Sequence, residues 1–158
     1  NFIIENEYVP YVNMAVDLSK ISKEDFCKIG DIVMADASED YMDIGKAIEI
    51  RSLGNENLIS GLHTHLLRYK NKCAIGFFGY LFQYRKIRLQ IMKMATGVSV
   101  LGISKTNLSK IIMKIPCIEE QKRIATFLTA LDEKINKVGE QAEQMREWKK
   151  GLLQQMFV

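Results

Sequence analysis

The 158-residue chain has few of the residues that mark secreted or membrane proteins. Its three cysteines, Cys27, Cys73 and Cys117, form no CxxC pair, so a disulfide framework is not expected. No apolar run approaches the roughly 20 residues of a membrane helix, and residues 1–5 lack the basic lead of a signal peptide. We therefore expect a reduced, cytoplasmic protein with no membrane segment.

The chain also lacks the motifs of several enzyme classes. It has no GxxxxGK[ST] phosphate loop, no GxGxxG and no serine nucleophile elbow. With only Pro10 and Pro116, it cannot contain the Asn-Pro-Pro-aromatic motif of an amino-methyltransferase. These absences argue against an autonomous NTPase, methyltransferase or hydrolase, so we expect a non-catalytic chain with no cofactor of its own.

Acidic residues are missing from one long segment. Residues 57–118 contain ten lysines and arginines but no Asp or Glu, whereas residues 1–56 contain 12 acidic and 5 basic side chains. Such a block projects a positive field that suits a polyanion such as nucleic acid. The alternative is that some of these bases pair with the acidic first third of the chain.

Polar side chains that reach phosphates and base edges are interleaved with the bases of this segment. Arg85 and Arg88 are spaced to share a helix face, and Ser99 and Lys105 are expected in turns, where functional contacts concentrate. The predicted DNA-contacting residues are His63, His65, Arg68, Lys70, Lys72, Arg85, Lys86, Arg88, Lys93, Thr96, Ser99, Ser104, Lys105, Thr106 and Asn107.

The sequence also offers two alternatives to DNA contact. His63 and His65 form an HxH pair that could ligate a metal, but nothing marks a third ligand. Five acidic residues partly resemble the carboxylate cluster of a nuclease: Asp36, Glu39, Asp40, Asp43 and Glu49. This group lacks the lysine that would activate water, so a solvated loop is favoured and no metal site is predicted.

The pattern before Pro116 is that of a mixed α+β domain. We expect strands at residues 31–34 and 47–51, a turn at 37–40 between them, and a further strand within 59–69. A helix is expected over residues 74–94, with Phe77, Phe78, Leu81 and Phe82 in the core. A capped turn at 104–108 and a closing strand at 110–115 complete this domain, which we bound at residues 1–117.

The pattern after Pro116 is that of one long helix, residues 118–158, with a seven-residue apolar repeat. One column is Ile124, Leu131, Val138, Met145 and Leu152, and the other is Leu128, Ile135, Ala142, Lys149 and Met156. A helix of about 38 residues is on the order of 57 Å long, more than the width of the preceding domain. Its stripe therefore needs a partner helix from another chain, unless the helix folds back on its own domain.

The same region resembles a known family pattern, P-x-x-E-Q-x-x-I-A-x-x-L-x-x-x-D-x-x-I. The matching residues are Pro116, Glu119 or Glu120, Gln121, Ile124, Ala125, Leu128, Asp132 and Ile135. Residues 148–157 resemble the ending K-x-x-L-L-x-x-L-F, and residues 30–33, 44–46, 96–99 and 103–108 resemble motifs of the target recognition domain. The family is the specificity (S) subunit of type I restriction-modification systems.

The resemblance implies a target recognition domain that reads one half of a bipartite site in double-stranded DNA, followed by a helix that docks methyltransferase and restriction subunits. Because one domain and one helix are present, the chain resembles a half subunit or a fragment. Restriction and adenine-N6 methylation would belong to partner subunits using ATP, Mg and S-adenosylmethionine. We expect a homodimer in which two copies pair antiparallel through the helix about a two-fold axis. The competing reading is a coiled-coil adaptor that does not bind DNA, or a truncated relic.

Overall fold

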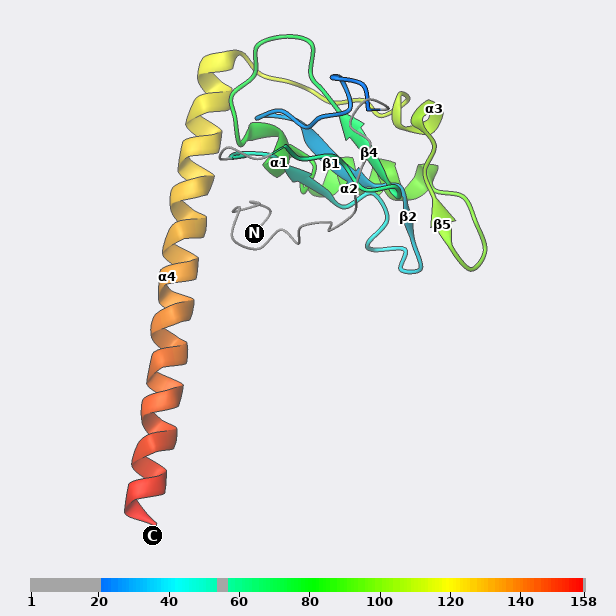
Figure 1. Ribbon diagram of the computed structural model, residues 1–158. Coiled ribbons are helices and arrows are strands. Elements are labelled where there is room, and N and C mark those ends of the chain that lie inside the picture. The colour runs from blue at the N-terminus through cyan, green and yellow to red at the C-terminus, as the bar shows by residue number, and fades with distance from the viewer. Residues whose placement is uncertain (1–20, 54–56, 158) are drawn as a thin grey trace. The chain divides into compact units, whose positions relative to one another are not determined.

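The computed structural model describes residues 21–53 and 57–157 (Figure 1). The chain divides into two compact units, residues 1–125 and 126–158, which are described separately. The expectation about residues 1–5 falls outside the described residues.

A three-stranded antiparallel sheet forms the centre of the first unit. Its strands are β1 (Ile32–Ala35), β3 (Ala47–Glu49) and β4 (Thr64–Leu67), in the order β3-β1-β4. In the central register Val33 lies opposite Ile48 on one side and Leu66 on the other. All three strands lie within the predicted strand regions to within one residue. Burial alternates along β1, where Ile32 and Met34 face the core and Val33 is half-buried.

A second pairing joins β2 (Ala37–Ser38) to β5 (Leu101–Gly102). The expectation of a turn at residues 37–40 is therefore wrong for its first two residues. The sequence could not reveal this short ribbon, because its partner strand lies more than 60 residues later and supplies the backbone hydrogen bonds.

The single helix expected over residues 74–94 is in fact two helices, α1 (Phe77–Leu81) and α2 (Arg85–Met94). Phe78 and Ile87 are both buried, yet nine residues of a straight helix would turn them about 180° apart. Tyr84, with an extended backbone, breaks the helix and lets both side chains face the same core. The predicted core residues Phe77, Phe78 and Phe82 are buried, and Leu81 packs beside them.

The capped turn is confirmed, whereas the closing strand is wrong. Helix α3 (Lys105–Leu108) begins after Ser104, whose side chain accepts a hydrogen bond from the Asn107 backbone N–H. Residues 111–117 form no regular structure. The amide side chain of Gln90 replaces a strand partner there, accepting from the Ile112 N–H and donating to the Ile112 carbonyl, both at 3.0 Å.

The long helix is confirmed as α4 (Ile118–Met156), with Glu119 and Glu120 in its first turn. Within the first unit its buried Gln121 accepts from the Ala74 N–H at 3.0 Å and donates to the Pro116 carbonyl at 2.9 Å. Ala125 joins the core. The fold is α+β as predicted, and no described helix is long and apolar enough to cross a membrane.

Candidate nucleic-acid interface

Most bases of the carboxylate-free segment reach solvent. Within residues 21–53 and 57–157, eight are exposed and form no ion pair: Lys70, Lys72, Arg85, Lys86, Lys93, Lys105, Lys110 and Lys114. They come from the β4–α1 connection, from α2, and from α3 and the segment that follows it. Within the described residues, ion pairs with acidic side chains therefore engage few of the ten bases, and the exposed ones contribute a positive field at the surface.

Arg68 is the clearest exception. Its guanidinium holds the buried carboxylate of Asp31 through two hydrogen bonds, Nε–Oδ1 at 2.9 Å and Nη2–Oδ2 at 2.6 Å. It also donates to the Glu24 and Phe26 carbonyls. The bonds to Asp31 raise the pKa of Arg68 above its ordinary value. This predicted DNA contact thus joins β4 to the segment before β1, and its donors are already engaged.

The Arg88 side chain is likewise engaged inside the domain. Its Nη2 donates to the Met42 carbonyl at 2.8 Å, and its Nη1 is buried with no hydrogen-bond acceptor among the described residues. Burial lowers the pKa of this guanidinium. Arg85 and Arg88 therefore do not act alike: Arg85 is exposed, whereas Arg88 holds the loop between β2 and β3.

The two histidines also differ. His65 lies on β4 with its Nε2 2.7 Å from the Ile103 carbonyl oxygen, which ties β4 to the segment after β5. His63 is exposed, and its Nδ1 lies 3.9 Å from the Asp36 carboxylate. His63 remains open to a ligand, and His65 has a partner in the fold.

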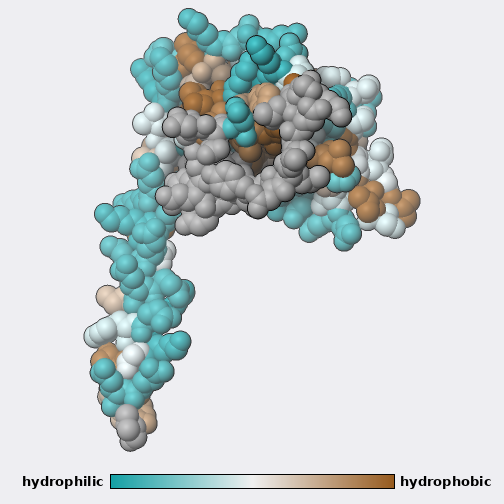
Figure 2. All heavy atoms as spheres, in the orientation of Figure 1, coloured by the Kyte–Doolittle hydropathy of each residue, from teal (hydrophilic) through white to brown (hydrophobic). Residues whose placement is uncertain are grey.

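An outward loop follows α2. Thr96 and Gly102 exchange two backbone hydrogen bonds of 2.9 and 2.8 Å, which close residues 97–101 into a loop. Gly97 has φ +138°, and a Cβ there would lie 2.0 Å from the Val100 carbonyl oxygen. Ser99 and Val100 are exposed and Val98 is fully so. Figure 2 shows apolar atoms at this end of the β2–β5 ribbon.

This loop carries the functional candidate that sequence reasoning missed. Thr96 and Ser99 were predicted from their hydroxyls, whereas Val98 is an apolar side chain that is fully exposed. The available signal was a valine directly after Gly97, between the hydroxyl-bearing residues Thr96 and Ser99. An exposed methyl-bearing side chain can contact the thymine methyl group in a major groove.

Helix α3 divides its predicted contacts into two kinds. Lys105 and Thr106 are exposed. Ser104 caps the helix, and the Asn107 side chain donates to the Met94 carbonyl at 2.9 Å and accepts from Lys110. Ser104 therefore stabilises the start of α3, and Asn107 fixes α3 against the end of α2.

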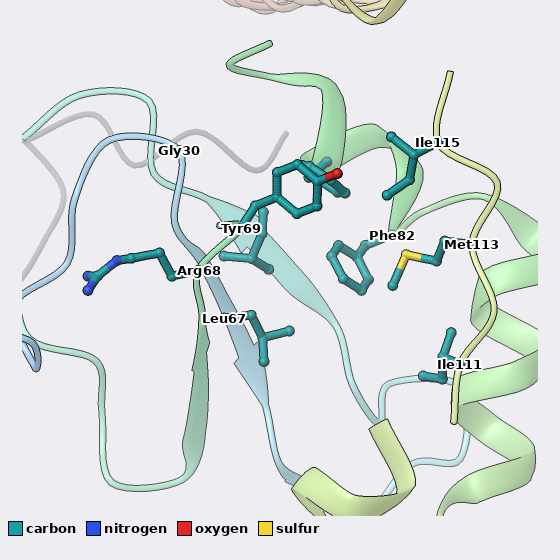
Figure 3. A pocket seen from close by; sticks show the side chains of 10 residues that line it. Gly30, Leu67, Arg68, Tyr69, Phe82, Ile111, Met113 and Ile115 are labelled. Carbon is teal, nitrogen blue, oxygen red and sulfur yellow. The ribbon is translucent and has the colours of Figure 1, made fainter. Parts of the chain in front are cut away.

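An apolar cavity of about 330 Å³ lies beside the sheet (Figure 3). Its walls are Gly30, Ile32, Leu67, Arg68, Tyr69, Phe78, Phe82, Ile111, Met113 and Ile115. The Arg68 guanidinium points away from the labelled apolar side chains. This cavity offers no cluster of donors for a phosphate.

The acidic residues serve the fold. Glu49 is buried, and its carboxylate accepts hydrogen bonds from the backbone N–H groups of Gly76 and Gly79 at the start of α1. Burial raises the pKa of Glu49. Asp40 accepts from the Met42 N–H within its own loop. Among the described residues, no three His, Cys, Asp or Glu side chains are grouped to hold a metal ion.

Comparison with known proteins identifies the class to which this fold and surface correspond. Residues 3–144 match the family model described as the type I restriction modification DNA specificity domain. The chain belongs to this family.

Two curated relatives from Methanocaldococcus jannaschii carry corresponding names. The chain is 34% identical over 146 residues to a protein named as the specificity subunit of the type I restriction enzyme MjaX. It is 30% identical over 106 residues to the type I restriction enzyme MjaVIII specificity subunit. These alignments cover 87% and 66% of this chain, but only 33% and 24% of the two relatives. The chain thus spans a third or less of the length of either relative.

Proposed function

We propose that this chain is a non-catalytic, sequence-specific DNA-binding component of a type I restriction-modification complex. It reads one half of a bipartite site and positions methyltransferase and restriction subunits on it. The observation that carries the proposal is the family match over residues 3–144. The eight exposed, unpaired bases of a segment without carboxylates support it independently.

The exposed bases supply affinity through DNA phosphates. Each phosphate neutralised by a lysine or arginine releases counterions, so binding weakens steeply as salt rises. Arg85, Lys86 and Lys93 of α2 and Lys105 of α3 are the main candidates, because their side chains are exposed and make no ion pair within the described chain. Lys70 and Lys72 extend this surface along the β4–α1 connection.

Sequence is read mainly by the loop of residues 97–101 and the start of α3. Thr96, Ser99 and Thr106 offer hydroxyl groups to base edges, and Val98 offers an apolar contact. His65, Arg68, Arg88, Ser104 and Asn107 have partners inside the domain and act by holding the contact elements in place.

The chemistry belongs to other subunits. S-adenosylmethionine, ATP and Mg would bind to the methyltransferase and restriction subunits, which α4 docks in the cytoplasm. Two copies of this chain pair through the apolar columns of α4, so the pair carries two recognition units. A two-fold pair of identical units reads an interrupted palindrome.

The main test is a map of adenine methylation in cells that express this chain with a type I methyltransferase subunit of the same genome. A new interrupted palindrome is the expected result. An asymmetric bipartite motif would instead mean pairing with a different specificity chain. No new motif, from a folded chain bound to its methyltransferase, would contradict the DNA-reading function and favour an adaptor.

A direct binding test uses a matched pair of variants. Replacing Arg85 and Lys86 together by alanine should reduce the slope of log K against log salt by about 1.8, because two phosphate contacts are lost. Replacing Lys137 and Lys150 of α4 removes the same charge and should leave the slope unchanged. Equal effects of the two double variants would mean that net charge, rather than the α2 surface, determines binding.

A further inference from the structure

Helix α2 holds a neighbouring segment on each of its two flanks. On one flank the Arg88 Nη2 donates to the Met42 carbonyl at 2.8 Å. On the other flank the Gln90 amide donates to the Ile112 carbonyl and accepts from the Ile112 N–H, both at 3.0 Å. Successive residues of a helix point about 100° apart, so residues 88 and 90 face opposite flanks and Leu89 lies between them. These contacts place Met42, Leu89 and Ile112 in one row across the helix.

All three side chains of this row are apolar and exposed: Met42 by 63%, Leu89 by 42% and Ile112 by 77%. Apolar side chains scattered singly over a surface are ordinary, whereas a connected apolar patch marks a contact site. The hydrogen bonds of Arg88 and Gln90 hold the backbones of the two outer members. A ligand on the row would therefore have little of it to order, which favours binding.

The segment after α3 shows why Ile112 stays outside the core. Ile111, Met113 and Ile115 point into the apolar cavity (Figure 3). The residues between them, Ile112 and Lys114, are exposed on the other side. The cavity wall thus uses one side of this segment, and the other side faces outward beside α2.

Cations surround the row. Arg85, Lys86 and Lys93 lie three or four residues from Leu89 on α2, a spacing that places them on the same helix face, and all three are exposed. Lys114 adds a further exposed base beside Ile112. The surface is therefore apolar in its centre and positive around it.

The Met42 end of the row carries less net charge. Asp43 pairs with Lys46 at 2.6 Å, and Asp40 accepts a hydrogen bond from the Met42 N–H within its own loop. The bases of α2 and Lys114 therefore decide which charge a ligand of this surface should carry.

We infer that this row docks a protein segment of another molecule, an amphipathic helix whose apolar stripe is flanked by acidic residues. An apolar centre with a charged edge is the anatomy of a protein–protein contact, and the surrounding cations select an acidic partner by charge complementarity. DNA phosphates are contacted by basic side chains, hydroxyls and backbone N–H groups. Three exposed apolar side chains would contribute nothing to such contacts.

The row overlaps one element of the proposed DNA contact. Arg85, Lys86 and Lys93 serve DNA phosphates in the function proposed above, so the acidic partner and DNA exclude each other at α2. This exclusion rests on the proposed function, whereas docking of the partner on the row does not.

The test uses a synthetic peptide and the full-length chain. The leucines of the peptide recur at the helical spacing i, i+3, i+4 and i+7, with glutamates between them. A control peptide has the same composition with its leucines spread around the helix. Amide chemical shifts of the chain report binding residue by residue, which is necessary because α4 also exposes apolar side chains that would bind such a peptide.

The expected result is a saturable shift of the amides around Met42, Leu89 and Ile112 with the amphipathic peptide, and a much smaller shift with the control peptide. Equal shifts with both peptides would mean that charge alone attracts them, and this would overturn the inference. The absence of saturable shifts at the row would overturn it as well.

Serine variants separate the apolar contact from the charge around it. Leu89→Ser and Ile112→Ser should each weaken the peptide affinity measured from those shifts about tenfold, since each removes a side chain that the peptide buries. Leu62→Ser is the matched control, because Leu62 is 91% exposed outside the row, and it should leave this affinity unchanged. All three side chains are exposed, so urea denaturation should show an unchanged fold. Unchanged peptide affinity in both row variants would overturn the inference.

The same variants decide between a protein and DNA as the ligand of the row. Neither row substitution removes a charge, so salt-dependent DNA binding should remain. A loss of DNA affinity as large as the loss of peptide affinity would assign the row to the DNA contact and overturn the docking of a protein.

These outcomes are separable from the DNA-binding proposal. A chain that binds the peptide at the row but shows no DNA binding would retain this inference and overturn the recognition function. A chain that binds DNA but gives no peptide shifts at the row would do the reverse.

Discussion

The two units of the chain treat apolar and charged side chains in opposite ways. In residues 21–125 Phe77, Phe78 and Ile91 are buried, and even buried charges such as Asp31 have partners nearby. In residues 126–157 the large apolar side chains are exposed, Met145 and Trp148 by about two thirds. The first unit thus provides partners for most of its buried side chains, with the Nη1 of Arg88 as an exception, whereas the second leaves most of its large apolar side chains exposed. Substitutions should therefore affect folding in the first unit and association in the second.

The largest expected effect is on the folding of the first unit. Arg68→Ala should lower its free energy of unfolding by about 3 kcal/mol, because the buried Asp31 carboxylate loses its charged partner. Urea denaturation followed by circular dichroism measures the loss. Lys70→Ala, an exposed base two residues away, is the control and should change it by less than about 0.5 kcal/mol. Equal stabilities of the two variants would contradict a structural role for Arg68.

The next effect concerns association alone. Ile135→Glu places a charge in one of the two apolar columns of α4. It should weaken the proposed self-pairing about 100-fold or more, since each dimer would bury two unpaired carboxylates. Light scattering measures the change, and the unfolding of the first unit should not move. Lys137→Gln changes the net charge by the same amount at a position outside the apolar columns, and this variant should remain dimeric. A dimeric Ile135→Glu chain would remove the proposed distinction between the units.

A smaller effect is expected in the outward loop. Gly97→Ala should destabilise the loop by about 1–3 kcal/mol, because φ is +138° and the added Cβ meets the Val100 carbonyl oxygen. Amide hydrogen exchange at residues 96–102 reports the loss, and DNA affinity should fall with it. Gly61→Ala, where the nearest atom would lie 3.9 Å from the Cβ, should leave both unchanged.

The smallest effect is a dependence on pH. Burial raises the pKa of Glu49, so its deprotonation costs more in the folded chain than in the unfolded chain. The wild type should therefore lose unfolding free energy relative to Glu49→Gln as the pH rises from about 4.3, the ordinary pKa of glutamate, through the raised value. Paired denaturation curves across this range measure the difference. A difference that grows in the opposite direction would contradict the assignment.

Local patterns predicted the elements whose stability is local. The heptad repeat indicated α4, Ser104 indicated the cap of α3, and a short run of apolar, β-branched residues indicated β1. Two expectations failed because distant contacts decide them. The helix breaks at Tyr84, which lets Phe78 and Ile87 pack in the same core. The backbone of Ile112 is hydrogen-bonded to the Gln90 side chain instead of to a neighbouring strand.

For the candidate site too, local composition predicted one part and contacts between distant residues decided the rest. The missing carboxylates indicated a basic surface, and most of its bases are exposed. Charge counting could not separate Arg68 and Arg88 from Arg85, because their internal partners, Asp31 and the Met42 carbonyl, lie 37 and 46 residues away in the chain. Val98 was missed because its relevance comes from exposure, which composition does not encode.

The closure of residues 97–101 by backbone bonds between Thr96 and Gly102 has an evolutionary consequence. These bonds depend on the peptide groups and on Gly97, and they place no demand on the outward side chains of residues 98–100. Single codon changes at those three positions would alter what the loop contacts without weakening the scaffold beneath it. A chain built this way can acquire a new target by drift at its tip, one substitution at a time, while every intermediate remains folded.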